Sequence, residues 1–102
     1  MVSEEKMKEM VFEVMHMLYC HTPKEDLEEF YNAPKDKLTE MYHRTVGVWV
    51  RDTFNLWQFP WAPELVNGVD ESPEHPDAVS MNVVVRAWEQ LHHDIEKGYE
   101  KL

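Results

Sequence analysis

The segment at residues 46–61, VGVWVRDTFNLWQFPW, contains the residue types that most suggest a binding site. Arg51 and Asp52 lie within it, among three of the chain's four tryptophans, Trp49, Trp57 and Trp61. Ligand pockets commonly place a few charged groups among aromatic side chains, so Arg51 and Asp52 could orient a ligand. The alternative is structural. Asp52 falls in the apolar arc of a helix, where a carboxylate needs partners such as backbone N–H groups or an arginine.

Arg51 is expected at the edge of that arc, where its stem covers apolar surface and its guanidinium reaches outward. Asp77, near the start of the last helix, is the nearest candidate partner. A partly buried pair of this kind can hold bidentate geometry and fix the register of two helices. We therefore interpret the segment as core first, with a ligand pocket as the alternative.

Other catalytic or metal chemistry has weak support in the sequence. His16 and Cys20 are four residues apart on one helix, but a zinc site needs three or four ligands, and no second cluster has ligand spacing. Cys20 lacks an activating context, and no serine lies in a G-x-S-x-G turn. The three isolated glycines do not form a phosphate-binding loop. We expect no enzymatic activity, no metal and no cofactor.

Acidic residues outnumber basic ones by 20 to 10, which gives a formal charge of −10. Such a surface repels nucleic acid and anionic lipid, so we expect no direct nucleic-acid binding and a basic partner. The acids form two groups along the chain, Glu25, Asp26, Glu28 and Glu29, and then Asp70, Glu71, Glu74 and Asp77. Either these groups dock a basic protein surface, or they are a solvated face and helix starts.

The elements that position these residues are expected to be helices. A first helix follows the cap Ser3, and its apolar residues spread over more than half of its circumference. TPKE at 22–25 predicts a short second helix with Thr22 as its N-cap. A third helix is predicted to run from Pro34 to about Leu56. Alternating β-branched residues in VGVWV leave a strand there as an alternative.

The last helix starts at either SPEH (72–75) or HPDA (75–78), each with proline at the first helical position. The proline-rich and aromatic residues 57–75 before it are expected to lie on the domain as a cover. The sequence therefore predicts an all-α fold, with three main helices plus one short helix in a compact bundle, a long aromatic cover loop, and a single domain over residues 1–102.

The first helix also predicts self-association. Four apolar residues flank its main stripe and would otherwise be exposed, namely Met10, Phe12, Met17 and Tyr19. Large exposed apolar patches usually mark an interface, so we expect a homodimer through this helix. The single Cys20, the acidic N-terminal residues and the lack of an 18-residue apolar run favour a cytoplasmic protein without a membrane span.

VGVWVRDTFNLW, followed by HPDAVSMNVVVRAWEQL, resembles a family of small uncharacterised bacterial and phage proteins. Its pattern is G-x-W-I-R-N-x-F-x-L-W, then H-P-D-x-x-S, then W-x-x-L. The matching residues are Gly47, Trp49, Arg51, Phe54, Leu56, Trp57, His75, Pro76, Asp77, Ser80, Trp88 and Leu91, within residues 38–92. Asp52 stands where the pattern has asparagine. The resemblance carries over no activity, but it implies that Arg51, His75, Asp77 and Ser80 lie together with the aromatic residues.

These observations predict a small acidic protein-interaction module, such as a phage or bacterial modulator or inhibitor that docks on a basic surface. One alternative is a binding protein for an anion or nucleotide with a pocket of tryptophans and arginine. Another is a nucleic-acid mimic that inhibits a host nuclease. The candidate ligand- or partner-binding residues are Trp49, Arg51, Asp52, Trp57, Trp61, His75, Asp77 and Ser80.

Overall fold

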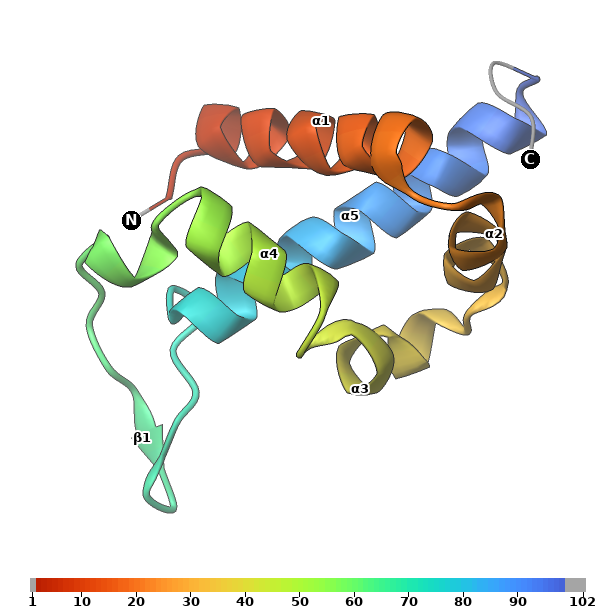
Figure 1. The fold of residues 1–102 in the computed structure, drawn as a ribbon. Helices are drawn as coiled ribbons and strands as arrows, with labels where there is room; N and C mark the ends of the chain where they lie inside the picture. Colours follow the sequence, from red (N-terminus) through yellow and green to blue (C-terminus); the bar gives the residue numbers. More distant parts are fainter. Residues whose placement is uncertain (1, 99–102) are drawn as a thin grey trace.

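The computed structural model describes residues 2–98 and is mostly helical (Figure 1). The elements are α1 (Glu4–His21), α2 (Lys24–Asn32), the 3₁₀ turn η1 (Lys35–Lys37), α3 (Leu38–Tyr42), α4 (Val46–Thr53), the 3₁₀ turn η2 (Leu56–Gln58), β1 (Leu65–Val66), β2 (Val69–Asp70) and α5 (Pro76–Glu96). The expected helical class is confirmed for most of the chain. The antiparallel pair β1–β2 is an addition that the all-α prediction lacked.

Helix α5 lies at the centre of the fold, and α1, α2, α3 and α4 all pack against it (Figure 1). Its predicted apolar stripe forms the middle of the core, where Val83, Val84, Ala87 and Leu91 are fully buried. Of the two predicted starts the second is correct, since His75 is the N-cap and Pro76 the first helical residue. No helix within residues 2–98 combines the length and apolar character needed to cross a membrane.

Helix α1 begins as predicted, because the Ser3 hydroxyl accepts a hydrogen bond of 3.1 Å from the Lys6 N–H. The expected exposed flank is mostly absent. Met10 is fully buried in the core, and Met17 and Tyr19 are half-buried. The wide apolar face of α1 packs against the rest of the fold. Of the four residues predicted to flank its stripe, only Phe12 is exposed, at 69%.

The predicted N-cap of the second helix is wrong. The Thr22 hydroxyl donates to the Met17 carbonyl, 3.0 Å away, so Thr22 caps the C-terminal end of α1. Helix α2 instead follows Pro23 without a side-chain cap.

The predicted third helix is broken at residues 43–45 into α3 and α4. The break turns α4 about its axis, so that Val50 is fully buried while Trp49 is only half-buried. Asp52 is exposed, which corrects the expectation of a buried carboxylate in the apolar arc. The VGVWV segment is helical, so the strand alternative is wrong.

The expected cover loop does not lie flat on the domain. Asn67 and Gly68 have positive φ values of 53° and 80°, as a two-residue hairpin turn requires, and join β1 to β2. The hairpin projects away from the helices (Figure 1), and Leu65 in it is 70% exposed. The aromatic part before it stays closer, because Phe59 and Trp61 are half-buried.

Candidate functional site

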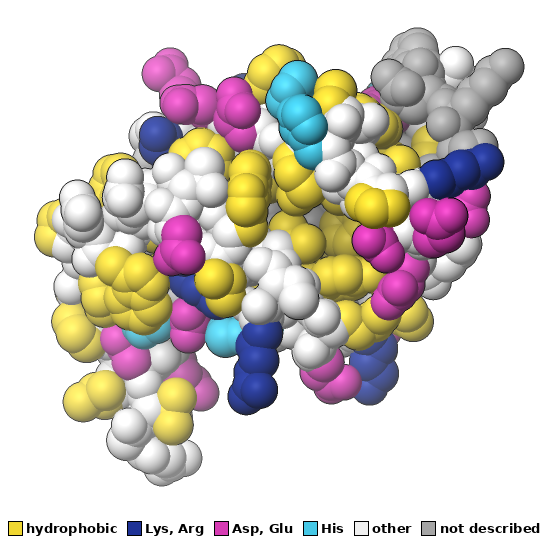
Figure 2. Space-filling view, viewed as in Figure 1, with side chains coloured by type: hydrophobic (Ala, Val, Ile, Leu, Met, Phe, Trp, Pro, Cys, Tyr) yellow, Lys and Arg dark blue, Asp and Glu magenta, His cyan; other side chains and the backbone are white. Residues whose placement is uncertain are grey.

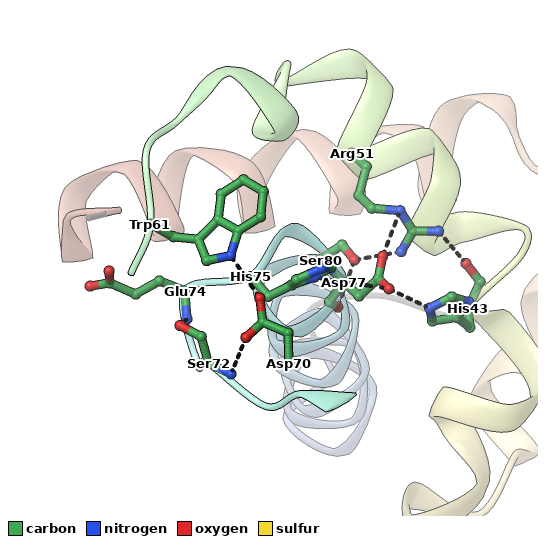
Figure 3. A network of polar contacts seen from close by, with 9 residues as sticks. All are labelled: His43, Arg51, Trp61, Asp70, Ser72, Glu74, His75, Asp77 and Ser80. Atoms are coloured by element: carbon green, nitrogen blue, oxygen red, sulfur yellow. Dashed lines mark hydrogen bonds and ion pairs between the residues drawn. The ribbon is translucent and has the colours of Figure 1, made fainter. Parts of the chain in front are cut away.

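Arg51 is the centre of a polar network that joins α4 to the start of α5 (Figure 3). Its Nη1 donates to the Ser80 hydroxyl and its Nη2 to the His43 carbonyl, each at 2.8 Å. Its Nε lies 3.5 Å from Oδ1 of Asp77. Arg51 is only 5% exposed, so these contacts take the place of water around a buried charge.

The predicted pairing of Arg51 with Asp77 is therefore present, but it is not bidentate. The guanidinium divides its donors among three residues instead. The His43 carbonyl is available because the chain leaves helical geometry between α3 and α4. Gly47 makes room for the arrangement, since a Cβ atom at this position would lie 3.2 Å from the Arg51 Nη1.

The first turn of α5 holds Asp77 in place. The His75 Nδ1 accepts from the Asp77 N–H at 3.0 Å, and the Ser80 hydroxyl donates to the Asp77 carbonyl at 2.9 Å. Oδ2 of Asp77 lies 3.5 Å from His43 Nε2. A carboxylate is also favoured at the positive end of a helix. The resemblance-based expectation that Arg51, His75, Asp77 and Ser80 lie together is thus met by the geometry.

Aromatic rings connect this network to the hairpin. Trp57, Trp61 and His75 pack edge to face, with ring centroids 5.3–6.1 Å apart, which leaves no space for a ligand among them. The Trp61 indole N–H donates to Oδ2 of Asp70 at 3.0 Å, and Oδ1 of Asp70 accepts from the Ser72 and Glu64 N–H groups.

These hydrogen bonds, first that of Trp61 and next that of Ser72, hold the pKa of the Asp70 carboxyl below its usual value. Asp70 therefore remains charged and joins the base of the hairpin to the aromatic rings.

Two of the predicted site residues lie apart from the network. Trp49 packs edge-on against Phe54, with centroids 6.3 Å apart, and no described polar contact joins it to Arg51. Asp52 is exposed on α4. In contrast, sequence reasoning missed His43, because its role depends on the break after α3.

A cleft of about 520 Å³ lies between α3, β2 and the start of α5, beside the network. Three carboxylates line it, those of Asp70, Glu71 and Asp77, together with the apolar side chains of Val69, Ala78 and Met81. His43 and His75 complete its polar wall. Arg51 compensates only one carboxylate, so the cleft is net negative when both histidines are neutral. The Glu74 carboxylate points away from it (Figure 3).

The other groups singled out in the sequence are at the surface. In the first acidic group, Glu25, Asp26 and Glu29 are exposed on α2, and Glu28 lies 3.9 Å from Lys24. His16 and Cys20 approach to 3.7 Å on α1. Within residues 2–98, no three His, Cys, Asp or Glu side chains gather closely enough to hold a metal ion.

Comparison with known proteins gives one match. A family model described as a domain of unknown function (DUF6794) covers residues 9–91. No curated protein and no solved structure matches the chain significantly.

Proposed function

Because this chain belongs to that family of domains of unknown function, we propose its role from the chemistry of its surface: it is a small acidic module that binds a basic segment of a partner protein in the cleft beside Asp77. A bacterial or phage modulator that acts in the cytoplasm is the cellular role we propose for such a module.

The observation that carries the proposal is the convergence of Asp70, Glu71 and Asp77 on a cleft with an apolar wall. A lysine or arginine side chain matches both features, because an apolar stem carries its cationic head. The Asp77 side chain is 43% exposed although one of its oxygens faces Arg51. Its carboxylate is therefore held in one orientation before a partner arrives, which reduces the entropy lost on binding.

The charge of the whole chain supports the same partner. A net charge of −10 attracts a basic protein from a distance and speeds the first encounter. The exposed acids of α2 add to this long-range field without belonging to the cleft. The anion-binding alternative is less favoured, because every guanidinium nitrogen of the buried Arg51 already has a contact within the protein.

Short peptides with one central lysine or arginine between apolar residues test the proposal, with norleucine or citrulline at the same place as neutral controls. Binding can be followed by amide chemical shifts in NMR. Glu71→Gln removes a charge from the cleft, whereas Glu74→Gln removes the same charge from a side chain that points away. We expect the first variant to bind roughly two- to fivefold more weakly and the second to bind as the wild type does.

Equal binding of the cationic and neutral peptides would contradict the proposal. So would equal weakening by the two variants, because the effect would then come from net charge and not from the cleft.

Self-association through α1 is a further part of the proposal. Phe12 is exposed on α1 and lines a groove of about 680 Å³ together with Val11, Met15 and Tyr19. A second copy that covers Phe12 would remove a large apolar side chain from water. Sedimentation should give a dimer mass for the wild type and a smaller mass for Phe12→Ser. A monomer mass for the wild type at high micromolar concentration would contradict the proposed self-association through α1.

A further inference from the structure

A second cavity, which we call the Tyr42 recess, lies on a different part of the surface. It has a volume of about 350 Å³ and is lined by the end of α1, by α2, and by the adjoining ends of α3 and α4. Its apolar lining includes Met17, Leu18, Phe30 and Val46. Figure 2 shows hydrophobic side chains at the bottom of a hollow on this face, with acidic side chains on the side of α2. The volume is at the lower end of the range for small-molecule sites.

The hydroxyl of Tyr42 gives this recess an unused polar group. It is shielded from solvent, and it has no hydrogen-bond partner among the described residues. The Tyr42 ring is held in place by an edge-to-face contact with Phe30, whose centroid is 5.0 Å away. A buried polar group without a partner is unfavourable, so most such groups in folded proteins acquire a protein, water or ligand partner.

Two carboxylates determine the charge of the recess. Asp26 and Glu29, from α2, belong to its lining, and no lysine, arginine or histidine does within the described part of the chain. Burial, followed by the charges of Glu29 and Asp26, raises the pKa of the Tyr42 hydroxyl above its usual value. Both carboxylates therefore act electrostatically on the hydroxyl, which stays protonated at neutral pH.

We propose that the Tyr42 recess binds a small amphipathic organic cation, whose ammonium group lies between Asp26, Glu29 and the Tyr42 hydroxyl and whose apolar part contacts Phe30 and Met17. The ammonium supplies a positive charge that compensates the two carboxylates, and it donates to the hydroxyl oxygen once the Tyr42 side chain has turned toward it, since the free protein shields this atom from solvent. The volume of the recess, about 350 Å³, suits a free small molecule.

This site is separate from the cleft beside Asp77. Residues Met41 and Tyr42 of α3 line the recess, whereas Thr39 and His43 line the cleft, so the α3 segment lies between the two. The inference goes beyond the proposed function and does not depend on it.

The experiment titrates the protein with 2-phenylethylamine and, as neutral and anionic controls of similar size, with 2-phenylethanol and phenylacetate. Amide chemical shifts in NMR report the place and strength of binding. The amine should saturate the signals of residues around Tyr42 at millimolar concentration, and the two controls should not. Glu29→Gln and Tyr42→Phe should each weaken amine binding roughly two- to fivefold.

Glu25→Gln is the matched control, because it removes the same charge from α2 at an exposed residue that does not line the recess. It should leave the affinity unchanged. The proposal is overturned if the amine does not bind saturably, if 2-phenylethanol binds equally well, or if Glu29→Gln and Tyr42→Phe have no more effect than Glu25→Gln. Both test variants are expected to fold, because Glu29→Gln changes an exposed residue and Tyr42→Phe removes a hydroxyl that has no partner among the described residues.

Discussion

Replacement of Arg51 by methionine tests whether the network beneath the cleft stabilises the fold. Methionine keeps most of the apolar stem but removes the guanidinium, and with it the donors to Ser80 and His43 and the contact with Asp77. The change therefore separates the polar contacts of Arg51 from its packing.

Two opposing effects determine the change in stability. Hydrogen bonds to charged groups contribute about 1.5–3 kcal/mol each, so the two bonds of 2.8 Å together contribute about 3–6 kcal/mol. Removal of the buried charge also removes a desolvation penalty of several kcal/mol, which offsets part of this loss. The Asp77 side chain is 43% exposed and can rehydrate, but the His43 carbonyl loses its donor. We expect a loss of about 2–3 kcal/mol in the free energy of unfolding.

Urea unfolding followed by far-UV circular dichroism measures this change, and Tm should fall by roughly 10 °C for a domain of this length. Arg44→Met is the matched control, because Arg44 is exposed and the same substitution there should change stability by less than about 0.5 kcal/mol. If both variants were equally stable, the network would not stabilise the fold. Should Arg51→Met then abolish binding of a partner or ligand, Arg51 would be a binding residue, as the pocket alternative holds.

Three other predictions follow from individual side chains. Tyr42→Phe should raise the free energy of unfolding by about 1 kcal/mol without ligand, because it removes a buried hydroxyl that lacks a partner; a loss of stability in urea unfolding would show that the hydroxyl is satisfied. Trp49→Ala should lower the free energy of unfolding by about 2 kcal/mol, because Trp49 is only half-buried. Truncation of a core tryptophan costs about 3–5 kcal/mol, so a measured loss above about 4 kcal/mol would place Trp49 in the core. The pKa of Asp70 is lowered by its hydrogen bonds, so the stability that it contributes is present above its unfolded value of 3.8 and is lost as pH falls through the lower folded value. The Trp61 indole N–H signal should shift in that acid range in the wild type, and Asp70→Asn should abolish the shift.

The polar cluster around Arg51 could be predicted in outline from the sequence. The pairing of Arg51 with Asp77 followed from the placement of one residue near the end of an apolar helix and the other at a helix start. The participation of Ser80 and His75 was implied by the resemblance. The exposure of Asp52 was not predicted, because the helical wheel assumed an unbroken helix through residues 43–45.

The hairpin was not predicted, although the Asn67-Gly68 dipeptide indicates it in the sequence. Asn67 and Gly68 lie between the apolar pair Leu65–Val66 and Val69, and Asn-Gly beside apolar residues is a strong local indication of a two-residue hairpin turn. The proline-rich surroundings favoured a loop, and the aromatic residues favoured burial. In the structure the aromatic residues and the hairpin behave differently, since Trp61 packs against His75 at the start of α5, whereas Leu65 in the hairpin is 70% exposed.

Features that depend only on neighbouring residues could be predicted from the sequence. The Ser3 cap and the buried stripe of α5 follow from hydrogen bonds and helical periodicity within a few turns of chain, and the start of α5 could be narrowed to two candidates, Pro73 or Pro76. The folded structure was needed to reveal the break before α4, the cleft beside Asp77 and the Tyr42 recess. Each of these depends on segments far apart in the sequence, such as the side chain of Ser80 meeting that of Arg51, and local propensity contains no information on which distant groups will meet.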